Sequence, residues 1–198
     1  MNTLSICIPT YNRADLLSVT LRDLCQAIRD NKLENTVEIC VSDNGSTDDT
    51  EQVIKDICLD FPKVRHRKNA RNLGFGRNLW SVVKLAQSDF VLPLGDDDAI
   101  SIVAIAEICK TLEYLQPNLL LLNSASGHHV ARMKASEQKL RKIRDIDHYL
   151  TELGAFHATF IGNLAFKRQV FLAVPEGSFI SATAYPHMVP FFACLTLS

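Results

Sequence analysis

The first 123 residues alternate between short apolar runs and longer segments with helical periodicity, which is typical of an α/β fold. The segments that we expect as strands are Leu4–Ile8, Val37–Ser42, Val64–Arg67, Phe90–Leu94 and Leu119–Asn123, and all except Val64–Arg67 are mostly apolar. Strands that alternate with helices pair in parallel, because each helix returns the chain to the same end of the sheet. We therefore expect a mostly parallel sheet that is flanked by helices.

Local signals set the boundaries of the intervening helices, which we expect at residues 14–29, 46–59, 75–86 and 101–115. Asn12 is suited to cap the first helix. Ser46 is suited to cap the second, with Asp49 three residues later as in a capping box. Gly74 introduces the third helix, and Pro62 ends the second.

Composition places the chain among ordinary globular proteins, because 47% of its 198 residues are hydrophobic and 22% are charged. The net charge of −1 offers no argument for nucleic-acid binding. The six cysteines form no C-x-x-C pair and mostly lie among apolar residues, so we expect them to be reduced and to lie in the core. Since the N-terminus shows no signal-peptide pattern, we expect a cytoplasmic protein.

Two acidic clusters directly follow apolar runs, Ser42–Thr50 after the second run and Asp96–Asp98 after the fourth. Ligands bind at the carboxyl edge of open α/β sheets, so the two clusters should meet there. Three adjacent carboxylates suit Mg²⁺ or Mn²⁺ that bridges phosphates, and a solvated acidic loop is the alternative. In the first cluster, Asp43 can accept a hydrogen bond from a base or ribose, and Gly45 permits a tight turn.

Two further loops carry residues suited to a nucleotide. In the turn after the first strand, the Tyr11 ring could stack on a base and Arg13 could face phosphate. The segment Asn69–Asn78 contains G-x-G without the third glycine of a dinucleotide-binding loop. There, Arg71 and Arg77 could neutralise a diphosphate. A capped turn and an ordinary loop with solvated arginines are the respective alternatives.

Taken together and in order, these motifs resemble those of family 2 glycosyltransferases, which have the GT-A fold. The resemblance covers roughly residues 3 to 110 and rests on Ser5–Arg13, Asp43–Asp48, Asn72–Gly74 and Leu94–Asp98. The Gly-Asp-Asp-Asp form is similar to that of bacterial O-antigen and capsule sugar transferases, including abequosyltransferase-like ones. The resemblance implies a Rossmann-like, mostly parallel sheet with a smaller acceptor-side portion.

The resemblance also implies the roles of individual residues. The nucleotide would be bound by Pro9, Tyr11, Arg13, Asp43, Asn44, Arg71, Asn72, Arg77 and Asp96. Asp97 and Asp98 would hold Mg²⁺ or Mn²⁺, and either could be the main ligand. Gly95 stands where many members have the first acid of the motif, so Asp96 could take over a ribose or sugar contact.

The general base of the family is an Asp or Glu in the acceptor half, and here the sequence leaves two candidates. Glu176 is the acid after Glu152, and His187 is the alternative. His187 could equally be a hydrogen-bonded core or acceptor-site residue. We expect one domain over 1–198, with a nucleotide-binding half (1–98) and an acceptor-side half (99–198). The chain ends in an apolar run, which leaves open that it is truncated.

The resemblance implies metal-dependent, inverting transfer of a sugar from a nucleotide-diphosphate sugar to a hydroxyl of a saccharide or lipid-linked acceptor, in cell-surface polysaccharide synthesis. A non-catalytic or degenerate sugar-nucleotide-binding domain is the alternative. The basic stretch Arg132–Arg144 could contact an anionic membrane or a lipid-diphosphate acceptor, at the inner face of the membrane. A solvated helix face is the simpler interpretation of that stretch.

Overall fold

The computed structural model describes residues 3–122, 143, 145, 147, 149, 161–181 and 185–196. The strands in this part of the chain are β1 (Leu4–Thr10), β2 (Val37–Asp43), β3 (Val64–Lys68), β4 (Phe90–Pro93), β5 (Leu119–Leu121) and β6 (Leu164–Lys167). The helices are α1 (Ala14–Asp30), α2 (Thr50–Asp60), α3 (Phe75–Leu85), α4 (Ile102–Leu115), α6 (Arg168–Ala173), α7 (Glu176–Ser181) and α8 (Met188–Thr196). A short 3₁₀ helix covers Ile161–Asn163.

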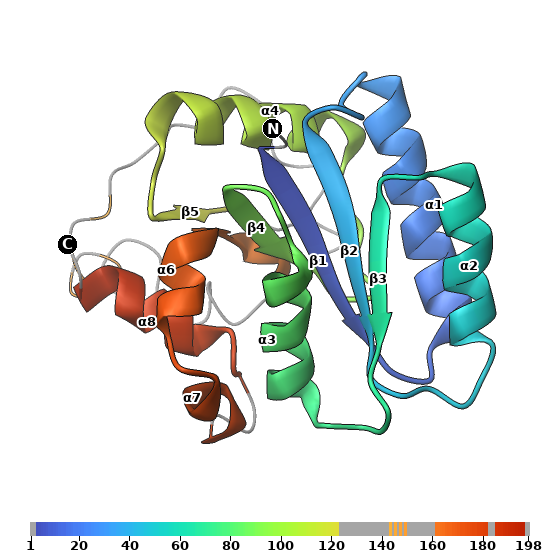
Figure 1. Cartoon of the computed structure of the whole chain (residues 1–198). Coiled ribbons are helices and arrows are strands. Elements are labelled where there is room, and N and C mark those ends of the chain that lie inside the picture. The colour runs from blue at the N-terminus through green and yellow to red at the C-terminus, as the bar shows by residue number, and fades with distance from the viewer. Residues whose placement is uncertain are drawn as a thin grey trace, which may run out of the picture.

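The strands form one sheet in the order β3-β2-β1-β4-β6-β5 (Figure 1). Parallel pairing joins β3, β2, β1 and β4, whereas β6 is antiparallel to both β4 and β5. This confirms the expected mostly parallel sheet. The strand order reverses at β1, which has β2 on one side and β4 on the other. In open sheets, such a switch point creates a crevice at the carboxyl ends of the strands.

Each face of the sheet carries its own hydrophobic core, because alternate strand residues point to opposite faces. In β1, for example, Ile6 packs in one core and Cys7 in the other. Helices α1, α2 and α4 cover the first face, and α3, α6, α7 and α8 cover the second (Figure 1). Strands β1, β2 and β4 are buried along their whole length, and most of their residues are apolar.

The six cysteines are free thiols, and all except Cys58 are buried. Burial raises the pKa of Cys25 and Cys194 to about 11 and that of Cys109 to about 12. A thiol that stays protonated is a poor nucleophile and a poor metal ligand. The cysteines therefore serve the core, as the sequence predicted.

Most helix boundaries agree with the sequence, but two predicted caps are wrong. Helix α2 begins at Thr50 and not near Ser46, whose buried hydroxyl instead accepts a hydrogen bond from the Asn12 N–H (2.9 Å). Asn12 does not cap α1, since the N-cap residue is Arg13 and the Asn12 side chain accepts from the Thr47 N–H (2.8 Å). In both cases the side chain joins two loops across the sheet edge, a long-range contact that outweighs the local signal.

The second half is only partly described. In the described part, β6 leads directly into α6. The basic stretch Arg132–Arg144 lies outside the described residues, apart from residue 143. The terminal apolar run forms α8. Within the described ranges, no helix is both long and apolar enough to cross a membrane.

A buried carboxylate joins three strands at the amino edge of the sheet, the edge opposite to both acidic clusters. Glu38 is 2% exposed and accepts hydrogen bonds from the Ser5 hydroxyl (2.6 Å), the Gln87 N–H (2.7 Å), the Ser88 N–H (3.1 Å) and Arg65 Nε (2.9 Å). Burial alone would raise the pKa of Glu38, but these donors lower it below its ordinary value. Glu38 is therefore a charged structural residue.

Candidate active site

The carboxyl ends of the parallel strands place three polar residues side by side. Thr10 ends β1, Asp43 ends β2 and Lys68 ends β3, and they are register neighbours in the sheet. On the other side of β1, the strand β4 leads directly into Asp96–Asp98. The two acidic clusters therefore meet at the same edge, as the sequence predicted.

Arg13 joins the turn after β1 to the acids after β4. Its Nη1 lies 2.7 Å from Asp96 Oδ1, and its Nη2 lies 2.6 Å from Asp97 Oδ2. The hydrogen bond to Asp97 and the charges of both acids raise the pKa of the Arg13 guanidinium. Asp96 is buried, and its second oxygen accepts from the Thr10 hydroxyl at 2.7 Å. Burial raises the pKa of Asp96, although Thr10 and Arg13 act in the opposite direction.

Gly95 leaves the space in which Asp97 and Asp98 converge. A Cβ atom at position 95 would lie 2.7 Å from Asp98 Oδ2 and 3.1 Å from Asp97 Oδ1. The Gly95 N–H also donates to Asp98 Oδ2 (3.1 Å). Since no side chain fills this point, one oxygen from each acid can approach it, and a side chain at 95 would collide with them.

This donor set fits Mg²⁺ or Mn²⁺. Both are hard cations that take carboxylate oxygens, and Mg²⁺ is usually held by one or two carboxylates plus substrate phosphates and water. Within the described ranges, no group of three or more His, Cys, Asp or Glu side chains is arranged to hold a metal ion.

Asp43 is buried but presents one oxygen without a hydrogen bond. Its Oδ1 accepts from the Ser46 N–H at 2.8 Å, which holds the carboxylate in place. Its Oδ2 is buried and accepts no hydrogen bond from the residues that the structure describes, and Lys68 Nζ lies 3.8 Å away. Buried polar atoms are nearly always hydrogen-bonded, so this oxygen is suited to accept an N–H or O–H of a ligand.

Gly45 brings the loop after β2 against the loop after β3. Gly45 has φ +80°, a conformation that L side chains rarely adopt, and a Cβ there would lie 2.8 Å from the Arg71 backbone. The tight turn predicted at Gly45 is confirmed. The Asn72 side chain accepts from Asn44 (2.9 Å) and from the Gly74 N–H (2.8 Å).

Asparagines from two loops and from helix α3 form a network beneath this edge. The buried Asn44 side chain accepts from Asn69 (3.1 Å) and from the Leu73 N–H (2.9 Å). Asn69 also donates to Asn78 Oδ1 at 3.0 Å, and the Asn78 amide donates to the Ser42 carbonyl at 2.8 Å. The network therefore fixes the two loops and the start of α3 relative to β2.

We expect Asn78→Ala to lower the free energy of unfolding by about 2 kcal/mol, because buried partners on Ser42 and Asn69 lose their hydrogen bonds. Urea denaturation measures this change. Asn35→Ala, at an exposed asparagine, is the control and should change stability by less than about 0.5 kcal/mol. Equal effects of the two substitutions would contradict the structural role of the network.

The remaining predicted nucleotide-binding residues differ in accessibility. Tyr11 is 39% exposed, so its ring is available for stacking. Arg71 and Arg77 are both exposed. Pro9, in contrast, is buried inside β1, and its side chain is part of the packed strand.

The two candidate bases lie on segments that pack against the start of α3. Arg77 Nε is 3.8 Å from Glu176 Oε1, and both side chains are half-exposed. His187 is buried and lies edge-on to the Tyr185 ring, 6.0 Å between centroids. Helix α7 lies beside α3 (Figure 1). Gly76 allows these two helices to pack closely, since a Cβ there would collide with the Phe179 carbonyl oxygen of α7.

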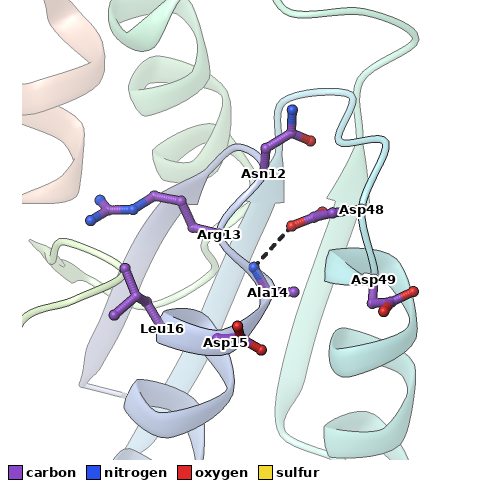
Figure 2. Close-up of a pocket in the computed structure, with 7 residues that line it drawn as sticks. All are labelled: Asn12, Arg13, Ala14, Asp15, Leu16, Asp48 and Asp49. Atoms are coloured by element: carbon purple, nitrogen blue, oxygen red, sulfur yellow. Dashed lines mark hydrogen bonds between the residues drawn. The ribbon is translucent and has the colours of Figure 1, made fainter.

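A pocket of about 360 Å³ lies beside this edge, between the start of α1 and the loop before α2. Asp48 accepts a hydrogen bond from the Ala14 N–H there, while the Arg13 side chain extends to the other side (Figure 2). Burial raises the pKa of Asp48, but hydrogen bonds from Thr50 and Ala14 together lower it below its ordinary value. Asp15 and Asp49 also line the pocket, and three acids disfavour a diphosphate. We therefore do not assign the binding of a nucleotide-sugar donor to this pocket.

Comparison with known proteins decides the family. The family model described as Glycosyl transferase family 2 matches residues 5–171, which is most of the chain. The chain belongs to glycosyltransferase family 2. The resemblance of the ordered motifs is thereby confirmed at the level of the family.

Among family 2 relatives, abequosyltransferase RfbV of Salmonella typhimurium is 29% identical over 201 residues, covering 93% of this chain and 59% of that protein. The crystal structure of S. aureus TarS 1–349 matches with a TM-score of 0.68 and 18% identity, over 96% of this chain and 55% of that one. Mannosyltransferase PcManGT from Pyrobaculum calidifontis, in complex with GDP-Man and Mn²⁺, matches with a TM-score of 0.65 and 18% identity, over 93% and 50%. These likenesses confirm the GT-A type of α/β fold. The chain spans between half and 59% of the length of these proteins.

Several polar residues at or beneath the carboxyl edge of the sheet had no role predicted from the sequence. Asn69 and Asn78 stood within the quoted loop segment, but the sequence did not show that they bond to each other. Thr10 stood only within the Ser5–Arg13 motif, and Lys68 directly followed the third predicted strand, with no role predicted for either side chain. A polar side chain at a position that should be buried, such as Asn78 on the inner face of α3, is the signal that would have revealed the network.

Proposed function

We propose that this family 2 chain transfers a sugar from a nucleotide-diphosphate sugar to a hydroxyl of a saccharide or lipid-linked acceptor in cell-surface polysaccharide synthesis. One observation carries the proposal. Two carboxylates converge beside Gly95 at the strand edge where Asp43 presents a buried oxygen without a donor. A divalent cation at the first point and a nucleoside at the second would place the diphosphate between them.

The donor is bound by residues of the first half. Asp43 Oδ2 accepts an N–H of the base or a hydroxyl of the ribose, and the exposed Tyr11 ring packs against the nucleoside. The asparagine network holds the surrounding loops in this geometry before the donor arrives, which reduces the entropy that binding costs. Arg71 lies beside the same loop and contributes positive charge toward the diphosphate.

Asp97 and Asp98 would hold Mg²⁺ or Mn²⁺, which stabilises the negative charge that develops on the departing diphosphate. In the inverting reaction, the acceptor hydroxyl attacks the anomeric carbon as the bond to the diphosphate breaks. Glu176 takes the hydroxyl proton in this proposal, since it lies at the start of α7 beside Arg77 and remains accessible. His187 is the alternative base, and its burial makes it less accessible to an acceptor.

Donor turnover tests the proposal. The chain is incubated with UDP-, GDP-, CDP- and dTDP-sugars and Mn²⁺, and release of the nucleoside diphosphate is measured with and without EDTA. We expect release from one nucleotide class, dependent on the cation and lowered in Asp43→Ala. A folded chain that binds a nucleotide but releases no diphosphate, even with candidate acceptors present, would favour a degenerate binding domain.

A further inference from the structure

Arg13 contacts two acids of the site, Asp96 and Asp97, which differ in their surroundings. It precedes α1 at the turn after β1, and its side chain is 42% exposed, so the guanidinium can move. One nitrogen binds the buried Asp96 and the other binds the half-exposed Asp97. Asp96 keeps the Thr10 hydroxyl as a second partner, whereas Asp97 turns its other oxygen toward the point beside Gly95.

A cation beside Gly95 and the Arg13 guanidinium would compete for Asp97. Each is positively charged and is attracted to the same carboxylate, and like charges a few ångströms apart repel. A diphosphate placed at this crevice changes the balance, because a guanidinium binds phosphate oxygens with two parallel hydrogen bonds. The arginine then has a second anionic partner at the moment when the cation takes Asp97.

We propose that Arg13 is an exchangeable counter-charge: it neutralises Asp97 in the free protein and turns to the donor diphosphate when the divalent cation takes Asp97. This inference rests on the proposed function, because it uses the same cation and diphosphate. It makes binding of the cation and binding of the nucleotide mutually dependent. Arg13 is thus a positioning residue for the cation and a direct contact for the diphosphate.

The test is a titration of Mn²⁺ followed by the paramagnetic resonance signal of the free ion, in wild type, Arg13→Gln and Arg13→Lys. Without nucleotide, we expect Arg13→Gln to bind Mn²⁺ about tenfold more tightly than wild type, because the competing charge is gone. With saturating UDP, GDP, CDP or dTDP, whichever binds, the nucleotide-induced gain in Mn²⁺ affinity should fall about tenfold in Arg13→Gln. Arg13→Lys, which keeps the charge, should lie close to wild type without nucleotide.

Arg22→Gln is the matched control, since it removes an exposed arginine from α1, nine residues after Arg13 in the sequence, and it should leave both quantities unchanged. Thermal melting verifies that each variant is folded. Equal Mn²⁺ affinity of wild type and Arg13→Gln without nucleotide would overturn the inference, as would an unchanged nucleotide effect. Absence of Mn²⁺ binding in both proteins would overturn it too. The nucleotide-free titration needs no turnover, so its outcome is separate from failure of the proposed function.

Discussion

Asp98→Asn is expected to lower cation-dependent release of nucleoside diphosphate about 10³-fold, which corresponds to about 4 kcal/mol of transition-state stabilisation. The Asp98 carboxylate oxygen is one of two that reach the point beside Gly95. An amide oxygen at this position is a weaker ligand for a hard cation, and it brings no charge to oppose that of the ion. The effect should appear in turnover at saturating Mn²⁺ as well as in the affinity for Mn²⁺.

Asp89→Asn is the matched control for this substitution. Asp89 is exposed and precedes β4 at the opposite end of the same strand, so the same chemical change is made away from the site. Turnover by Asp89→Asn should match wild type within about twofold. Retention of wild-type turnover by Asp98→Asn and by Asp97→Asn would contradict the assignment of the two acids to the cation.

Glu38→Ala is expected to lower the free energy of unfolding at pH 7 by about 3 kcal/mol. The substitution leaves the buried Ser5 and Ser88 donors and the Gln87 N–H without their acceptor, and Arg65 without its ion pair. Breaking a buried network by removing one member is costly because the remaining groups stay dehydrated. Urea denaturation measures the change, and Glu107→Ala, at an exposed helix position, is the control.

The stabilisation by Glu38 should depend on pH with a definite sign. The pKa of Glu38 is lowered in the folded protein, so its contribution is fully present above the unfolded value of about 4.3. It is lost as the pH falls through the folded pKa. The difference in stability between wild type and Glu38→Ala should therefore be constant between pH 6 and 8 and shrink below about pH 4. A difference that grows on acidification would contradict the charged role of Glu38.

The strands and helices of the first half follow from local patterns. Phe90–Pro93 is buried on both faces, so a continuous apolar run is enough to predict this strand. Val37–Asp43 is also buried on both faces, and its β-branched residues predict a strand although Glu38 and Ser42 interrupt the apolar run. Gly74 and Ser101 lie next to the first residues of their helices, as predicted. Periodicity also predicts that both acidic clusters reach one sheet edge, since parallel strands end there.

Contacts between loops were beyond the reach of local patterns. Ser46 and Asn12 have the chemistry of helix caps, but in the fold each bonds to the other loop. The pairing of Arg13 with Asp96 and Asp97 spans more than eighty residues of sequence. Such contacts depend on strand order, which a single sequence constrains only weakly.

Binding of a nucleoside diphosphate that depends on a divalent cation tests the central claim most directly. The thermal midpoint of the chain is measured with UDP, GDP, CDP and dTDP, each with and without Mn²⁺, in wild type and Asp98→Ala. A ligand that binds only the folded state raises the midpoint by mass action. We predict a rise for one nucleotide that requires Mn²⁺ and disappears in Asp98→Ala. No rise with any nucleotide, on a sample that melts cooperatively, would contradict the assignment of this sheet edge to a nucleotide-sugar donor.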